Sequence, residues 1–221
     1  MCTVTYIPTE NQGFALTSNR DEKAVRPTKS PEIYSVNNVE MAFPKDLEKG
    51  GTWIAAGNND RMVCLLNGAF VSHQKQDFHT HSRGVVLLDM AAFKGNTKDF
   101  FENEPLQNTE PFTITSIEKK NEKITGIQEF IWDGAQKHIS QLDIEKPYIW
   151  SSSTLYADKD RVLRKKWFND FLKENQPSIS PAKAYAFHSG NHILDQSISL
   201  LMEREGGLKT VSITQVVPLK E

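Results

Sequence analysis

The start of the chain constrains the fold most, because two strand-like segments there are separated only by turn residues. Residues 2–7 (CTVTYI) and 13–18 (GFALTS) alternate or are β-branched, which is typical of half-buried strands. The intervening PTENQ contains residues that favour turns. We therefore predict an antiparallel hairpin in which paired residue numbers sum to 20 or 21, with Cys2 opposite Ser18 or Asn19.

The rest of the chain mixes strand and helix patterns. Strands are expected over 51–58, 61–70 and 209–217, and a strand meander over 111–142. Helical periodicity marks 83–93, 96–103, 158–175 and 191–207. In the third of these, the apolar stripe consists of Val162, Leu163, Trp167, Phe168, Phe171 and Leu172, and the basic residues from Arg161 to Trp167 are expected on a solvated face. This order predicts an α+β layered domain.

Composition narrows the class of protein. The 221 residues are 38% hydrophobic with no Pro/Gly/Ser-rich divider, which predicts one domain over 1–221. A net charge of −2 gives no reason to expect nucleic acid or a membrane surface as partner. There is no apolar run long enough for a membrane span, and no signal peptide is recognisable. The two cysteines, Cys2 and Cys64, are expected as free thiols in a soluble, cytoplasmic protein.

The predicted hairpin gathers reactive groups at Cys2. It brings Asn19, Arg20 and Asp21 beside the first residues of the chain. A guanidinium favours the thiolate, and a carboxylate can orient an α-amine whose ordinary pKa suits a general base. A nucleophile activated by its own terminal amine requires that Met1 be removed. The alternative is that Cys2 is a small strand residue and that Arg20 and Asp21 form a surface ion pair.

Three motifs together resemble a known family. MCTVTYIP, FALTSNRDE followed by Arg26-Pro27, and GGTWIAA (residues 50–56) are similar to the NRDE family, which includes the animal transport and Golgi organisation proteins. More remotely, the start resembles penicillin V acylase and bile-salt hydrolase. The resemblance implies an N-terminal-nucleophile hydrolase fold, a four-layer αββα sandwich, and cleavage of non-peptide amide bonds.

The resemblance also implies residue roles. Cys2 would be the nucleophile, Arg20 the partner of the thiolate or substrate, Asp21 the partner of the amine, and Asn67 an oxyanion-hole donor. Residues implied or considered for ligand binding are Asn19, Trp53, Ser153 and Lys209. The last two depart from the family, which often has asparagine at the position of Ser153 and arginine at that of Lys209.

Two other functions stay open from the sequence. On the same fold, the protein could bind or traffic haem or another hydrophobic ligand, with a histidine or Cys2 near the iron, or it could be an interaction protein with a vestigial site. No cofactor or metal is expected, because the histidines at 79, 81, 188 and 192 have no third ligand at a familiar spacing and are interpreted as loop and cap residues. Cys64 in MVCLL is expected to be buried. The expected partner is a small-molecule amide or hydrophobic ligand.

Overall fold

The computed structural model describes residues 3–10 and 13–218 of the chain. The chain forms two compact units, which are described separately. Unit 1 comprises Met1–Val25 and Ile144–Glu221, and unit 2 comprises Arg26–Asp143. Within the described residues, no helix combines the length and the hydrophobicity needed to cross a membrane.

Unit 1 is built on a five-stranded sheet with the order β10-β1-β2-β12-β11. The strands are β1 (Thr3–Thr9), β2 (Gly13–Lys23), β10 (Tyr148–Ser151), β11 (Glu203–Arg204) and β12 (Leu208–Val216). All the pairings are antiparallel. The predicted first hairpin and the predicted last strand are therefore confirmed.

The register of the first hairpin differs from the prediction. Thr3 pairs with Asn19 and Ile7 with Ala15, so paired numbers sum to 22 rather than 20 or 21. The difference arises because β1 continues through Pro8 and Thr9, which shortens the connection assumed between the strands. The predicted partner of Cys2 lies outside the described residues.

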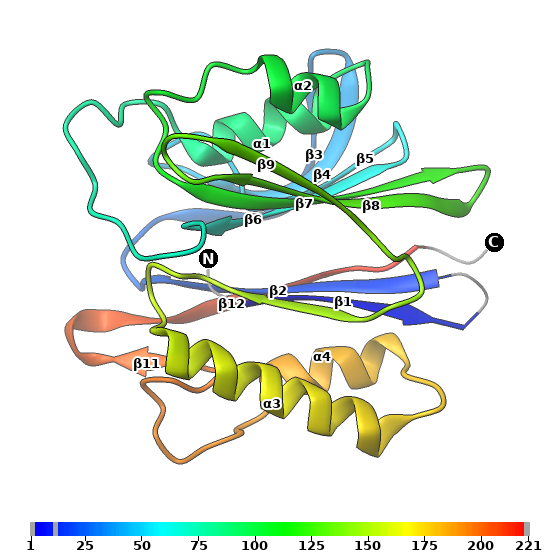
Figure 1. Ribbon diagram of the computed structural model, residues 1–221, viewed down its shortest axis with the longest axis vertical. Helices are drawn as coiled ribbons and strands as arrows, with labels where there is room; N and C mark the ends of the chain where they lie inside the picture. Colours follow the sequence, from blue (N-terminus) through cyan, green and yellow to red (C-terminus); the bar gives the residue numbers. More distant parts are fainter. Residues whose placement is uncertain (1–2, 11–12, 219–221) are drawn as a thin grey trace. The chain divides into compact units, whose positions relative to one another are not determined.

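Helices α3 (Asp158–Asn175) and α4 (Pro181–Ser189) cover one face of this sheet (Figure 1). Their apolar residues pack on Ile7 and Ala15 from the sheet to form a core. The helical members of that core are Phe168, Ala184 and Phe187, with Trp167, Phe171 and Leu172 partly buried against it. The predicted stripe of α3 is thus confirmed in its C-terminal half, whereas Val162 is 68% exposed.

The solvated basic face predicted for α3 is wrong at one position, because Arg164 is fully buried. Arg164 precedes Phe168 by four residues, which places both side chains on the same face of the helix. The hydrophobic pattern alone gave no reason to put a charged residue on that stripe.

The helix predicted over 191–207 is also wrong, because the helix in this region, α4, ends at Ser189. Ser180 caps the start of α4 by accepting a hydrogen bond from the backbone of Lys183, and Pro181 occupies its first turn. The following segment instead contains turns, with the Asp195 side chain accepting from Ser197 N at 2.9 Å. The carbonyls of this segment accept hydrogen bonds from side chains of other elements, so they are not committed to a helix.

Unit 2 is a seven-stranded antiparallel sheet with the strands in chain order. Its strands are β3 (Thr28–Val36), β4 (Val39–Asp46), β5 (Ile54–Gly57), β6 (Arg61–Asn67), β7 (Phe112–Lys120), β8 (Lys123–Trp132) and β9 (Lys137–Leu142). The predicted hairpin over 51–70 and the meander are confirmed, and the hairpin of β3 and β4 is additional. Its turn residues, Asn37 and Asn38, have φ values of 50° and 65°, as a type I′ turn requires.

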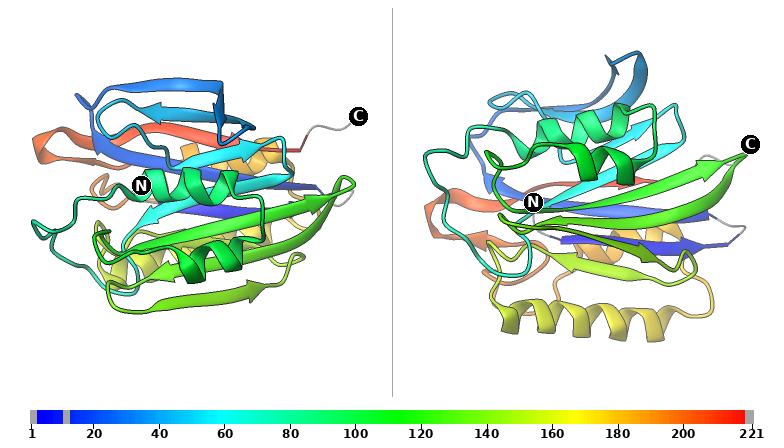
Figure 2. Two further views of the ribbon diagram at one scale, coloured as in Figure 1. Left: turned by 90° about the horizontal axis from the view of Figure 1, so that it is seen from above. Right: turned by 45° about the horizontal axis from the view of Figure 1, so that its top comes forward.

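Helices α1 (Arg83–Ala92) and α2 (Thr97–Asn103) belong to unit 2 and confirm the predicted helices there. Figures 1 and 2 show both beside the seven-stranded sheet, where α1 packs on β5 and β6. A close backbone contact fixes the start of α1. A Cβ added to Gly51 would lie 2.5 Å from the carbonyl carbon of Gly84, and a Cβ on Gly84 would lie 2.7 Å from Thr52 O.

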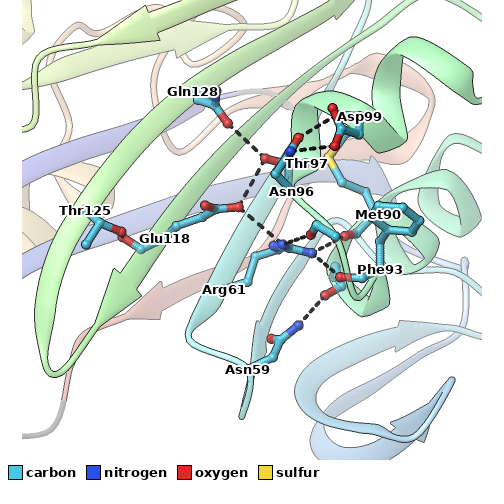
Figure 3. A network of polar contacts seen from close by, with 12 residues as sticks. Asn59, Arg61, Met90, Phe93, Asn96, Thr97, Asp99, Glu118, Thr125 and Gln128 are labelled. Atoms are coloured by element: carbon cyan, nitrogen blue, oxygen red, sulfur yellow. Dashed lines mark hydrogen bonds and ion pairs between the residues drawn. The ribbon is translucent and has the colours of Figure 1, made fainter.

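Arg61 anchors the other end of α1 (Figure 3). Its Nη1 donates to Met90 O at 2.9 Å and to Phe93 O at 2.7 Å, and its Nη2 donates to Gly95 O at 2.8 Å. Glu118 of β7 lies 3.3 Å from Nη2 and forms an ion pair with it. The side chain therefore satisfies carbonyls that a helix end leaves without intrahelical partners.

Candidate active site

One row of paired residues crosses the sheet of unit 1. Thr3 of β1 pairs with Ser151 on one side and with Asn19 on the other, and Asn19 pairs in turn with Ile213 of β12. Arg20 and Asp21 continue β2 beyond this row. Cys2, the predicted nucleophile, precedes Thr3 in sequence and lies outside the described residues.

Arg20 and Asp21 are buried, with exposed fractions of 4% and 3%. Neighbouring side chains of a strand point to opposite faces, so Arg20 and Asp21 project to different sides of the sheet. The alternative of a solvent-exposed ion pair between them is therefore wrong. A bulge in β12 between Thr210, which pairs with Asp21, and Ser212, which pairs with Arg20, lies directly beside the two residues.

The Asp21 carboxylate is oriented by two hydroxyl groups. Tyr156, which follows β10, donates to Oδ2 at 2.6 Å, and Thr210 Oγ1 lies 2.5 Å from Oδ1. The Thr210 hydroxyl itself accepts from Met202 N at 2.9 Å. Asp21 is thus held by a loop after β10 and by β12, two segments that are distant from it in sequence.

Asn19 uses its side chain to join β2 to α4 and to the segment after it. Its Nδ2 donates to His188 O at 3.2 Å and to Leu200 O at 2.8 Å, and its Oδ1 accepts from His188 Nδ1. The amide therefore supports the row that contains Thr3.

His188 is a buried, neutral residue rather than a loop or cap histidine. Burial lowers the pKa of its imidazole to about 3, with smaller contributions from the positive charges of His192 and Arg164. An amide oxygen can only accept, so Nδ1 carries the proton that Asn19 Oδ1 accepts. The unprotonated Nε2 then accepts from the Thr5 hydroxyl at 2.7 Å.

The other predicted site residues fall in both units. In unit 1, Ser153 is buried just after β10, and Lys209 is exposed on β12 opposite Glu22. In unit 2, Trp53 is buried directly before β5, and Asn67 is the last residue of β6, where it pairs with Phe112. Unit 1 therefore gathers Asn19, Arg20, Asp21, Ser153 and Lys209 on one sheet and its adjoining loop.

Sequence reasoning missed two residues of this region, Arg164 and Tyr156. The Arg164 guanidinium donates to the hydroxyl of Thr3, and its Cζ lies 3.4 Å from the centre of the Tyr156 ring. Helical spacing places Arg164 on the same face as Phe168, but nothing in the basic run distinguishes it as the residue that is buried. Tyr156 ends the segment SSSTLY, which also contains Ser153.

Ionisable groups with shifted pKa values also occur in unit 2. Burial raises the pKa of Asp89 and of Glu104, and in Glu104 the charge of Asp89 adds to the effect. Burial lowers the pKa of Lys137, whose Nζ donates to the carbonyls of Glu102 and Glu104 at 2.9 and 2.6 Å. Lys137 therefore supplies hydrogen-bond donors to carbonyl groups at the C-terminal end of α2. Within residues 3–10 and 13–218, no three His, Cys, Asp or Glu residues are grouped to hold a metal.

Solved structures with a similar fold cover most of the chain. A Caenorhabditis elegans N-acylethanolamine-hydrolyzing acid amidase ortholog matches with a TM-score of 0.66 and 13% identity, over 97% of this chain and 92% of that one. A variant of conjugated bile acid hydrolase from Clostridium perfringens matches with a TM-score of 0.50 and 11% identity, over 85% and 71%. Penicillin V acylase from Agrobacterium tumefaciens matches with a TM-score of 0.49 and 12% identity, over 84% of this chain and 69% of that one.

At these identities the likeness concerns the fold, which is the α+β fold of N-terminal-nucleophile hydrolases, as predicted. No curated protein matches the chain in sequence. A family model described as "Transport and Golgi organisation 2" matches residues 1–214, far beyond the first third in which the motifs are strongest. The chain belongs to the Transport and Golgi organisation 2 family.

Proposed function

We propose that the protein is an N-terminal-nucleophile hydrolase of the cysteine type, which cleaves the C–N bond of a small non-peptide amide. The observation that carries this proposal is the burial of Arg20 and Asp21 on β2, next to the row that contains Thr3. Thr3 is joined to Cys2 by a peptide bond. A cation and a carboxylate therefore lie on the strand next to β1. The residue before β1 carries a thiol and, after removal of Met1, an α-amine.

Burial of these two charges supports a functional role for them. Removing a charged group from water is costly unless it is paired and hydrogen-bonded, and even a buried pair adds little to stability. Arg20 and Asp21 would be poor choices if their only purpose were to hold the sheet together. Groups placed to act on a thiol and an amine account for both residues at once.

The proposed reaction has two stages. The α-amine of Cys2 takes the proton of its thiol, and the thiolate sulfur attacks the amide carbonyl carbon to form a tetrahedral oxyanion. The C–N bond then breaks, the leaving nitrogen takes the proton from the α-amine, and a thioester remains. Water, deprotonated by the same amine, attacks the thioester and releases the acid and the free thiol.

Other residues have proposed roles that rest on the family resemblance. Arg20 stabilises the thiolate or the substrate, and Asp21 orients the α-amine. Asn67 donates to the oxyanion, where a single donor contributes about 2.7–4 kcal/mol to transition-state stabilisation. Ser153, Trp53, Asn19 and Lys209 are proposed to bind or support the ligand. The similar Caenorhabditis elegans structure is that of an N-acylethanolamine-hydrolyzing acid amidase ortholog, so N-acyl amides are the first substrates to test.

The test begins with the intact mass of the purified protein, which reports whether Met1 has been removed. The protein is then assayed with fluorogenic amides of 7-amino-4-methylcoumarin that carry short, medium or long acyl chains. We expect turnover, and hydroxylamine should trap the thioester as an acyl hydroxamate. Cys2→Ala should abolish both signals.

Cys64→Ala is the matched control, because Cys64 is a fully buried thiol of unit 2 and should be dispensable for turnover. Full activity in protein that retains Met1, or in Cys2→Ala, would refute the proposal. No turnover of any amide by processed protein would also count against it. A Soret band at stoichiometric haem that disappears in Cys2→Ala would favour the ligand-binding alternative instead.

A further inference from the structure

Arg164 is a buried cation. Its side chain has no exposed surface, and none of the carboxylates in the described residues forms an ion pair with it. Instead, Nε and Nη2 donate to Ile198 O at 3.2 and 3.1 Å, and Nη2 also donates to Ser199 O at 2.5 Å. Neutral carbonyls hold the guanidinium in place but leave its charge uncompensated, which is an expensive arrangement for stability alone.

The first contact of functional interest is with β1. Arg164 Nη1 donates to the side-chain hydroxyl of Thr3, which is itself completely buried. Thr3 adjoins Cys2 in sequence, so this hydrogen bond fixes the strand residue that leads to the proposed nucleophile. Thr5, two residues further along the same strand, is held in a similar way by His188.

The second contact leads to the proposed partner of the amine. The guanidinium Cζ lies 3.4 Å from the centre of the Tyr156 ring, within the range of a cation–π interaction. The hydroxyl of that ring donates to Asp21 Oδ2 at 2.6 Å. Tyr156 is 1% exposed and Asp21 is 3% exposed, so this chain of contacts is packed in the interior.

We propose that Arg164 is a positioning residue for the proposed hydrolytic site, with one arm through Thr3 to Cys2 and another through Tyr156 to Asp21. This inference rests on the proposed function of Cys2. A single guanidinium thereby sets the position of the nucleophile's strand relative to the carboxylate that orients its amine. Removing this positive charge should also disfavour a thiolate at Cys2.

Other charged and titratable groups lie on the elements that make these contacts or adjoin them, and they define what the test must control. They are Arg20 and Asp21 from β2, His188 and His192 from α4 and the loop after it, Tyr156 from the loop after β10, and Arg204 from β11. Arg204 is the most useful comparison, because its Cζ lies 5.1 Å from the centre of the same Tyr156 ring. It donates to Ser197 O and Leu155 O and has no hydrogen bond to β1.

The test compares Arg164→Gln with variants that break one arm each. Thr3→Val removes the hydroxyl without changing the volume, and Tyr156→Phe keeps the ring but removes the bond to Asp21. We expect kcat for the coumarin amides to fall about ten- to a hundredfold in each variant, with KM little changed, because small displacements of reacting groups have effects of this size. Thr3→Ser, which keeps the hydroxyl, should restore most of the rate.

A second measurement does not depend on turnover. The rate of Cys2 alkylation by iodoacetamide is followed against pH by mass spectrometry of the N-terminal peptide. The midpoint of the profile should move to higher pH in Arg164→Gln and stay in place in Arg204→Gln. Thr3→Val and Tyr156→Phe supply the rate comparison even where Arg164→Gln fails to fold.

The outcomes separate the two proposals. If the wild-type protein hydrolyses amides but Thr3→Val or Tyr156→Phe keeps the wild-type kcat, the proposed role of Arg164 is overturned. The proposed function then still stands. The role of Arg164 is also overturned if folded Arg164→Gln shows the same midpoint as wild type in the pH profile of Cys2 alkylation. Wild-type protein that cleaves no amide, yet shows the expected shift in alkylation, would refute the proposed function and leave the effect of Arg164 on Cys2 established.

Discussion

The buried imidazole of His188 should make the stability of the protein depend on pH. Its pKa is lowered from 6.5 to about 3 in the folded protein, chiefly by burial. In the unfolded chain the imidazole takes up a proton as the pH falls below about 6.5, whereas in the folded chain it stays neutral until about pH 3. The unfolded state therefore binds more protons between these limits, and stability is lost as the pH falls.

The size of the effect follows from the two pKa values. Integrated from pH 7 to pH 5, the difference in proton binding lowers the free energy of unfolding by about 2 kcal/mol. With a urea dependence of about 2–3 kcal/mol per molar, the unfolding midpoint should fall by roughly 0.7–1 M over this range. The carboxylates Asp133 and Asp195, whose pKa values are lowered, contribute mainly at more acidic pH.

The assay is urea unfolding of wild type and His188→Gln at pH 7 and pH 5, followed by tryptophan fluorescence. The variant is expected to be less stable at pH 7, because Thr5 and Asn19 lose well-placed partners, but to lack the loss of about 2 kcal/mol between pH 7 and pH 5. His192→Gln is the control and should keep most of the loss, since that ring is only partly buried. An equal fall in the midpoint of wild type and His188→Gln would refute the reasoning.

Two further predictions concern unit 2. Gly51→Ala should lower the free energy of unfolding by about 3 kcal/mol, because the new Cβ meets backbone that no rotamer change can move. Gly50→Ala, where only a φ of 72° opposes the change, should cost about 1 kcal/mol, and equal urea midpoints for the two variants would contradict this account. Arg61→Gln should cost about 2–3 kcal/mol, because the carbonyls of Met90 and Phe93 lose their donor, and should speed hydrogen exchange at the end of α1. Unchanged exchange at Phe93 and Gly95 would show that Arg61 does not anchor that end.

Much of the fold could be predicted because its elements follow local rules. The hairpins, the meander and α1–α3 have periodic apolar residues and suitable turns, and these patterns were enough to place them. The helix predicted over 191–207 does not form, although the apolar spacing there is helix-like. Side chains distant in sequence bind the carbonyls that a helix would use. Arg164 and Asn19 bind the carbonyls of residues 198–200, and no local pattern contains that information.

The candidate site could be predicted only in part, for a related reason. Arg20 and Asp21 were identifiable because a hairpin brings them to the start of the chain. Arg164 and Tyr156 reach the same region through packing between α3 and the sheet, and a basic residue in a run of lysines gives no sign that it is buried. Burial of Arg20 and Asp21 likewise depends on the complete tertiary structure.

The division of unit 1 between the two ends of the chain has a consequence for synthesis on the ribosome. Strands β1 and β2 are made first, but β10, which pairs with β1, begins at Tyr148, and β12, which pairs with β2, begins at Leu208. At typical elongation rates, roughly 6 to 24 seconds separate Val25 from Ile144, the point at which unit 1 resumes. During that interval the first hairpin has two unpaired edges and buried-type side chains such as Val4 and Phe14 still uncovered. Unit 2, which is continuous in sequence, is complete before unit 1 can close, so nascent chains stalled near Asp143 should be those that most need a chaperone.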